Sequence, residues 1–176
     1  MAGSELPLAA RLCWQQPKVH HRAYELLADG LVAGTLNFES VAGTRARAVF
    51  GDRAWTFRKT GFFHSRVLVR EDSAFKEVAV FDGGMSYKGD LRFETGQHYL
   101  WRPCNVWQTR WAFFTPEGEE KLALEYKGLV RQSANIRISQ ALDAVEEAPL
   151  LTALGWYLVL LLQNEYAAVA LASGGG

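Results

Sequence analysis

The sequence lacks most of the features by which an enzyme or a nucleic-acid-binding protein is identified. It contains no glycine-rich phosphate-binding motif, and its two cysteines, Cys13 and Cys104, lie too far apart for a CxxC or zinc pattern. Lysine plus arginine number 19, as do aspartate plus glutamate, so no net positive charge attracts nucleic acid. We therefore expect two reduced thiols, no nucleic-acid partner and no cofactor.

A secretory leader is also missing from the printed sequence. Residues Met1 to Leu8 contain no basic region followed by an apolar run, which is the pattern of a signal peptide. Together with the two unpaired cysteines, this favours a cytoplasmic protein.

Candidate catalytic and metal-binding side chains form no recognisable pattern. Ser86 lies between Gly84 and Gly89, but the second glycine is one position too late for a nucleophile elbow. His20 and His21 are adjacent, so on a strand they would point to opposite faces and could not easily chelate one ion. We expect no metal site and no enzymatic activity. An enzyme whose site residues are scattered along the sequence is the alternative.

What the sequence does contain is a long series of short apolar or alternating runs separated by turn residues. In Arg53–Lys59, Trp55 and Phe57 share one face, while polar and small residues share the other. Asp29-Gly30 is typical of a two-residue hairpin turn. The expected strands are Tyr24–Ala28, Leu31–Phe38, Thr44–Phe50, Arg53–Lys59, Ser65–Arg70, Phe75–Phe81, Met85–Lys88, Leu91–Glu94, Gln97–Arg102, Gln108–Phe114, Lys121–Lys127 and Asn135–Ser139. About twelve strands between residues 6 and 139 predict a mainly β fold, a closed antiparallel barrel.

The pattern changes near residue 149. From Pro149 to Ala172 leucine and alanine dominate without a polar stripe, which favours a helix that begins at Pro149 and ends at Ser173-Gly174. A helix that is apolar on every side must be surrounded on every side. We therefore predict a single domain over residues 1–176, in which a core helix at about 149–172 fills the barrel and residues 173–176 form a flexible tail. A lumenal carrier function is disfavoured because the helix would occupy the lumen.

A membrane anchor formed by residues 150–171 is the other explanation of this segment. Gln163, Asn164 and Glu165 interrupt its apolar run, and a charge at the centre of a bilayer costs about 2.5–3.5 kcal/mol. The core helix is therefore preferred. We expect Glu165 to reach the barrel rim or to pair with an arginine, because an isolated buried carboxylate would take up a proton.

The most suggestive charge feature is a basic stretch in the first half of the chain. Between Arg45 and Arg70 there are seven basic residues and one acid, Asp52. If the basic side chains all point outward from adjacent strands, they form one patch that could grip phosphates. The candidate ligand-binding residues are Arg45, Arg47, Arg58, Arg66 and Arg70. They predict either a binding module for an anionic ligand, such as a phospholipid headgroup on a membrane surface, or a solvated barrel exterior whose charges bind nothing.

A second candidate is the loop over Trp101–Trp107. Pro103 and Asn105 indicate a rigid connection between strands, in which Trp107 is partly exposed. Either a ligand contact or plain loop packing would explain it.

A barrel closed by about twelve strands and followed by an apolar helix resembles the tubby-like superfamily, which comprises the tubby C-terminal domain, the LURP-one-related proteins and the phospholipid scramblases. The segments that carry the resemblance are Ala54–Lys59, Gly89–Phe93, Tyr99–Trp101, Trp111–Phe114 and Gly155–Leu162. These segments resemble those of small bacterial proteins of this kind. The resemblance implies a barrel around a central helix and a role at phospholipids, because tubby domains bind phosphoinositides through basic side chains on the barrel exterior. No calcium segment rich in aspartate accompanies the helix, so scramblase activity is not implied.

Overall fold

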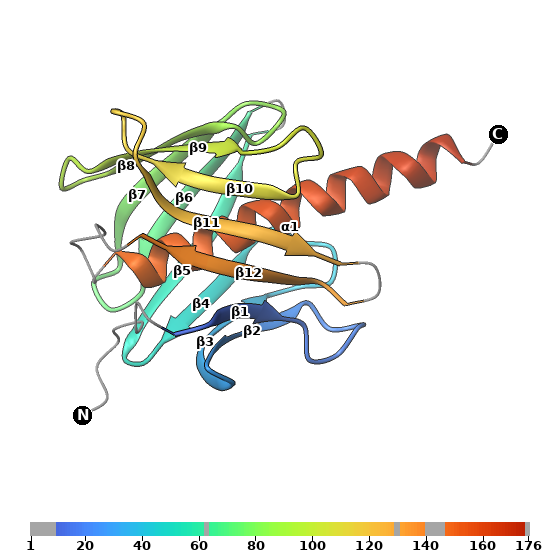
Figure 1. Ribbon diagram of the computed structural model, residues 1–176, viewed down its shortest axis with the longest axis horizontal. Helices are drawn as coiled ribbons and strands as arrows, with labels where there is room; N and C mark the ends of the chain where they lie inside the picture. Colours follow the sequence, from blue (N-terminus) through green and yellow to red (C-terminus); the bar gives the residue numbers. More distant parts are fainter. Residues whose placement is uncertain (1–9, 62–63, 129–130, 140–146, 175–176) are drawn as a thin grey trace.

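The computed structural model describes residues 10–61, 64–128, 131–139 and 147–174, which form a closed antiparallel β-barrel with one C-terminal helix (Figure 1). The strands are β1 (Leu12–Gln15), β2 (Ala23–Ala28), β3 (Leu31–Phe38), β4 (Ala46–Phe50), β5 (Arg53–Thr60), β6 (Ser65–Glu71), β7 (Lys76–Gly83), β8 (Gly89–Phe93), β9 (His98–Pro103), β10 (Arg110–Phe114), β11 (Glu120–Lys127) and β12 (Ser133–Ile138). Each strand pairs with its neighbours in the chain, and β1 pairs with β12 to close the sheet. Closure leaves no open sheet edge.

The alternation of apolar and polar residues in the sequence corresponds to the inner and outer faces of the barrel wall. In β5, Trp55 and Phe57 are fully buried and point into the barrel, while Arg58 is exposed on the outer face. Asp29 and Gly30 both have positive φ, 49° and 86°, as the predicted hairpin turn requires. The predicted fold class is therefore confirmed.

Two details of the strand prediction were wrong. Met85–Lys88, expected as a strand, is a turn between β7 and β8, because Tyr87 adopts a left-handed backbone with φ of 57° that a strand does not tolerate. The strand β1 was not among the expected runs, although it supplies the pairing that closes the barrel. The start of the expected strand region, residues 6–9, lies outside the described residues.

The helix α1 (Ala148–Ser173) enters the barrel and fills its interior. Its residues 148–162 are all buried. Trp156 stacks on Trp14 at 6.4 Å between ring centroids, and the Trp14 indole N–H donates to the carbonyl oxygen of Thr152 at 3.3 Å. Gly155 allows close approach of the wall, because a Cβ there would lie 2.7 Å from a methyl carbon of Leu124. The barrel core is therefore the shared interior of sheet and helix.

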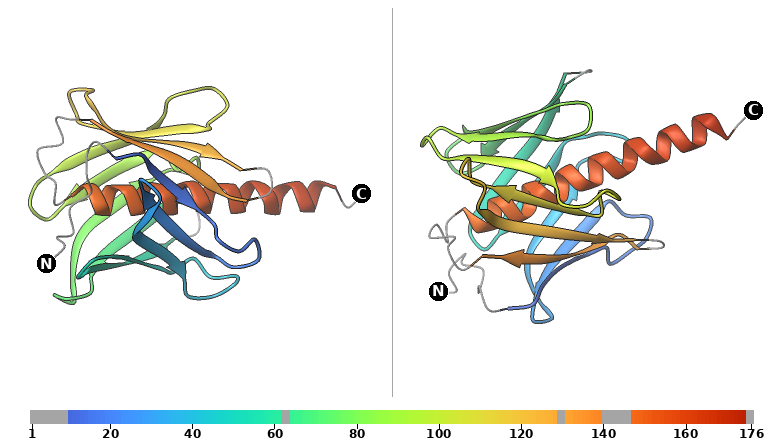
Figure 2. Two further views of the ribbon diagram at one scale, coloured as in Figure 1. Left: turned by 60° about the horizontal axis from the view of Figure 1, so that its bottom comes forward. Right: turned by 45° about the horizontal axis from the view of Figure 1, so that its top comes forward.

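The prediction that the whole helix is core was wrong beyond Leu162. Gln163 is half-buried, and every residue from Asn164 to Gly174 is exposed as α1 projects from the barrel (Figure 2). The cause is length. An eight-residue strand spans about 26 Å at ~3.3 Å per residue, and a tilt of about 40° reduces this to a barrel height of about 20 Å. Fifteen helical residues cover about 22 Å, so the remaining eleven must leave the barrel. Of the tail expected at 173–176, Ser173 is still helical, Gly174 is the C-cap residue of α1, and residues 175–176 lie outside the described residues.

Candidate functional site

The two ends of the barrel differ, and each is named here by its loops. The exit end, where α1 leaves the barrel, carries the loops that follow odd-numbered strands. Its described loop residues are 16–22, 39–45, 61, 64, 84–88, 104–109, 128 and 131–132. The far end carries the turns that follow even-numbered strands, at residues 29–30, 51–52, 72–75, 94–97 and 115–119. The projecting segment is Gln163–Ser173 of α1.

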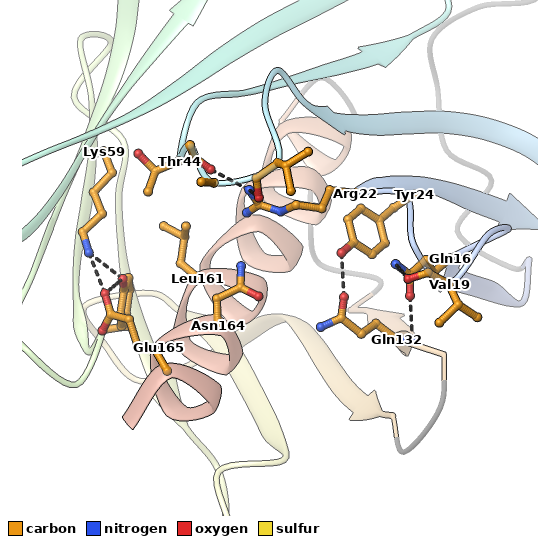
Figure 3. A pocket seen from close by; sticks show the side chains of 15 residues that line it. Gln16, Val19, Arg22, Tyr24, Thr44, Lys59, Gln132, Leu161, Asn164 and Glu165 are labelled. Atoms are coloured by element: carbon orange, nitrogen blue, oxygen red, sulfur yellow. Dashed lines mark hydrogen bonds and ion pairs between the residues drawn. The ribbon is translucent and has the colours of Figure 1, made fainter. Parts of the chain in front are cut away.

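A cavity of about 580 Å³ lies at the exit end, between α1 and the surrounding loops (Figure 3). We call it the mouth pocket. It is lined by Gln16, Val19, Arg22, Tyr24, Val41, Ala42, Gly43, Thr44, Lys59, Tyr87, Gln132, Leu161, Asn164, Glu165 and Ala168. Most of the barrel is filled by the helix, and this pocket opens where the helix begins to emerge.

One wall of the mouth pocket is a cluster of three side chains, Lys59, Tyr87 and Glu165. The Lys59 ammonium lies 2.7 Å from Glu165 Oε1 and 2.8 Å from the Tyr87 hydroxyl, which itself donates to Glu165. Burial by itself would lower the pKa of Lys59, but its hydrogen bonds to Glu165 and Tyr87 raise that pKa. The amine therefore stays protonated and is no nucleophile. The cluster ties α1 to β5 and to the β7–β8 turn at the barrel rim.

This cluster settles the position expected for Glu165. It does reach the barrel rim, but its partner is a lysine and not an arginine. The Glu165 side chain is 47% exposed, so it is not an isolated buried acid. Tyr87 was not recognised in the sequence because it lies in a segment predicted as a strand.

On another side of the mouth pocket, Arg22 fastens the β3–β4 loop. Its Nη1 donates to the carbonyl oxygens of Ser40, Val41 and Gly43, and its guanidinium lies 3.8 Å from the centroid of the Phe38 ring. Arg22 is half-buried, and this burial lowers the pKa of its guanidinium. No carboxylate among the described residues pairs with it.

The third side of the pocket is held by amide and phenol groups. The Tyr24 hydroxyl donates to Gln132 Oε1 at 2.6 Å, and burial raises the pKa of Tyr24 to about 12. Gln16 donates to the carbonyl oxygens of Val19 and His21, which fixes the β1–β2 loop. The polar groups here are satisfied by one another, so this side is a stable wall.

The candidate arginines do point outward, but they do not form one continuous patch. Arg47 pairs with Asp72 at 2.6 Å, and Arg66 lies 3.5 Å from Asp82. Both acids belong to neighbouring segments of the outer wall, so much of the expected positive charge is neutralised there.

The remaining three arginines come together at a small cavity of about 210 Å³ on the outer wall, which we call the wall pocket. Arg45, Arg58 and Arg70 line it with one acid, Glu77. Arg45 also pairs with Glu39 at 3.2 Å, whereas Arg58 has no ion pair with any described residue. The Nε of Arg70 is buried without a hydrogen-bond partner among the described residues.

The other sequence candidates do not converge. Trp107 is 85% exposed, as expected, at the tip of a loop in which Asn105 Oδ1 accepts from two backbone amides. Ser86 lies in the exposed β7–β8 turn. Cys13 and Cys104 are free, and burial raises the pKa of both thiols. Within the described ranges, no group of histidine, cysteine and acidic side chains could hold a metal ion.

Exposed apolar side chains concentrate at the exit end. Of the eleven large hydrophobic residues that are exposed in the described structure, five lie on exit-end loops and three on the projecting segment. The loop residues are Val19, Val41, Met85, Val106 and Trp107, and the helix residues are Tyr166, Val169 and Leu171. Apolar tips on several loops around an apolar helix are typical of an interaction surface.

Charges are segregated between the same two ends. The described exit-end loops carry the bases Lys18, Arg22, Arg45, Lys88 and Arg131 and one acid, Glu39. The far-end turns carry the acids Asp29, Asp52, Asp72, Glu94, Glu117 and Glu119 and no lysine or arginine. In the described chain, surplus bases thus lie on the exit-end loops, which are also the apolar ones, and surplus acids lie on the far-end turns, where Asp72, Glu94 and Glu119 are paired with bases of nearby strands.

Comparison with known proteins identifies no relative. The chain matches no protein-family model, and neither the curated proteins nor the solved structures give a match to it. The barrel and its C-terminal helix are therefore known from the structure, and membership of the tubby-like superfamily stays a prediction.

Proposed function

We propose that the protein is a non-enzymatic module of the cytoplasm that binds the surface of membranes containing anionic phospholipids, with its exit end facing the lipid. The observation that carries the proposal is the coincidence of exposed apolar side chains and surplus bases on one end of the barrel. Interfacial binding strengthens with buried apolar area and with attraction to anionic lipids.

The projecting segment has the dimensions and polarity of an interfacial anchor. Its outer part, Tyr166–Ala172, extends about 10 Å, which is less than the depth of one leaflet of a hydrocarbon core about 30 Å thick. Asn164 and Glu165 line the mouth pocket, and the half-buried Gln163 precedes them on α1, at the level where headgroups would be. Tyr166 follows at the level favoured by amphipathic aromatic rings, and after it the segment is apolar to Ala172.

This arrangement argues against a helix that crosses the membrane. By length and composition α1 could cross a bilayer, but half of its most apolar window is buried inside the barrel. Spanning would require the barrel to lose its core. A shallow insertion of Tyr166–Ala172 keeps the barrel intact.

Vesicle sedimentation tests the apolar part of the proposal with a matched pair of leucines. Leu171 on the projecting segment is 82% exposed, and Leu31 at the far end is 77% exposed. Burial of one leucine contributes about 1.5–3 kcal/mol, so Leu171→Asp is expected to weaken binding at least tenfold. Leu31→Asp is expected to leave binding unchanged. Equal effects of the two substitutions would refute docking by the exit end.

The electrostatic part is tested by neutralising bases at two locations. Each base near an anionic surface contributes about 1 kcal/mol, so Lys18→Gln with Arg131→Gln is expected to weaken binding about thirtyfold. The loss should appear with vesicles that contain phosphatidylserine and should vanish in high salt. Arg58→Gln, which removes an exposed base from the side wall, is the control.

The wall pocket supports a second candidate, a headgroup site on the barrel exterior. Its specific support is the buried, unpartnered Nε of Arg70 beside the unpaired Arg58. Here Arg58→Gln would abolish binding of an anionic headgroup and the exit-end variants would not. The same set of proteins therefore decides between the two locations.

A further inference from the structure

The mouth pocket has features that docking of the barrel end does not require. Its volume of about 580 Å³ lies within the range of about 300–1,000 Å³ that is usual for small-molecule sites. It opens beside the projecting segment, between α1 and the β1–β2 and β3–β4 loops (Figure 3). A molecule in it would contact both the barrel and the part of the helix that we place in lipid.

Arg22 gives the pocket a cation without a counter-ion. Its hydrogen bonds to the β3–β4 loop use Nη1 alone, so Nε and Nη2 have no hydrogen-bond partner among the described residues. A half-buried guanidinium forms stronger hydrogen bonds with a charged acceptor than with a neutral one, and its planar edge matches the spacing of two phosphate oxygens. The free edge of Arg22 therefore suits an anionic group.

The opposite wall adds a second positive charge, on Lys59, which Glu165 already balances. The Lys59 ammonium has three donors, of which two are used by Tyr87 and Glu165. With Arg22, Lys59 and Glu165 lining the pocket, its net charge is one positive charge. This suits a ligand with a single phosphate more than a polyanion.

On the side of the helix, the lining combines the polar residues Asn164 and Glu165 with two apolar residues. Leu161 and Ala168 lie on the face of α1 that borders the pocket, and Val19 and Val41 border it from the loops. A free phosphate would leave this surface in water. A phosphate that carries acyl chains would cover it.

We propose that the mouth pocket binds one molecule of an anionic phospholipid, with its phosphate at the free edge of Arg22 and its acyl chains along Leu161, Ala168 and the projecting segment. The inference rests on the proposed function for its source of lipid, and it adds a site of one-to-one stoichiometry. Docking by loops and helix alone would require no such site.

Calorimetric titration with a monomeric short-chain lipid, dihexanoyl phosphatidic acid, tests the pocket without a membrane. The matched variants are Ala168→Trp, which fills the pocket, and Ala167→Trp, which adds the same indole to an exposed neighbour outside the lining. We expect one-to-one binding by the unmodified protein and by Ala167→Trp, and at least tenfold weaker binding by Ala168→Trp. Asn164→Trp, at another exposed lining position, should weaken binding in the same way.

Glycerol 3-phosphate, which has the phosphate without acyl chains, is the second probe. At least tenfold weaker binding of this probe supports the phospholipid, whereas equal binding would overturn the assignment in favour of a soluble phosphate. Equal lipid affinity of Ala168→Trp and Ala167→Trp would overturn the pocket itself. Failure of the unmodified protein to bind vesicles would reject only the docking proposal, because the monomeric lipid needs no membrane to reach the pocket.

Discussion

Replacement of Trp156 by alanine tests the central packing of the fold. Trp156 is fully buried on α1, stacks on Trp14 at 6.4 Å, and meets the rings of Tyr24 and Tyr126 at 5.6 and 6.1 Å. Truncation of a buried tryptophan costs about 3–5 kcal/mol, and each aromatic pair adds about 0.5–1.5 kcal/mol beyond burial. We expect the free energy of unfolding to fall by about 5 kcal/mol, at the upper end of the usual range.

The indole N–H of Trp156 indicates which interaction is lost in this substitution. It is buried without a hydrogen-bond partner among the described residues, so its removal leaves no new unsatisfied group and the loss comes from packing alone. Trp156→Phe, which keeps an aromatic ring, should therefore cost less than about 2 kcal/mol.

Urea unfolding followed by far-ultraviolet circular dichroism measures both variants. Leu171→Ala, at an 82% exposed position of the same helix, is the control and should stay within about 0.5 kcal/mol of the unmodified protein. A loss below about 1 kcal/mol for Trp156→Ala, or an equal loss for Leu171→Ala, would mean that the helix does not sit inside the barrel in solution.

Three further outcomes follow from the structure. Gly155→Leu should lower the free energy of unfolding by about 3 kcal/mol in the same denaturation assay, because even a Cβ at this position would lie only 2.7 Å from a methyl carbon of Leu124. A variant with the stability of the unmodified protein would contradict this packing. Burial raises the pKa of Tyr24 to about 12, above its unfolded value of about 10, so its contribution to stability is complete below pH ~10 and is lost as the pH rises through ~12. Tyr24→Phe should flatten that alkaline loss in unfolding measured against pH, and an unchanged slope would refute the role. Burial alone would raise the pKa of Asp72, but its hydrogen bonds, foremost that from Arg47, lower this pKa, so the carboxylate stabilises the fold above its unfolded pKa of about 3.9 and the contribution is lost in acid. Asp72→Asn should therefore lower the free energy of unfolding by about 1–2 kcal/mol at neutral pH and reduce its dependence on acid pH. A variant as stable as the parent would show that the pair of Asp72 and Arg47 contributes no stability.

Most of the fold could be predicted because local pattern and global structure agree. The alternation in β5 assigns Trp55 to the interior, and the Asp29-Gly30 turn fixes a hairpin. The four-residue strand β1 was missed because it is too short to show a period. Tyr87 was misplaced because aromatic residues favour strands, while its backbone here is left-handed. The exit of α1 could not be predicted, because composition reports that a helix is apolar and not how deep its barrel is.

The site was less accessible to sequence reasoning because it is made by separate loops. Alternation correctly placed Arg47 on the outer wall, but it could not reveal that Asp72 pairs with it across the barrel surface. The one visible signal of the mouth pocket was Glu165, a single charge within an apolar run. Its partners, Lys59 and Tyr87, lie 106 and 78 positions away, so only the folded barrel brings them together.

The placement of α1 after every strand has a consequence for biosynthesis. The pairing of β1 with β12, which closes the barrel, joins Leu12 to Ile136, and such a long-range contact forms slowly. The helix α1, which fills the barrel, is translated after both strands. Until Leu162 has emerged from the ribosome, the nascent sheet has nothing to cover inward aromatic rings such as those of Trp101 and Trp111. We therefore expect the growing chain to engage chaperones through these rings and to be released from them when its last helix is complete.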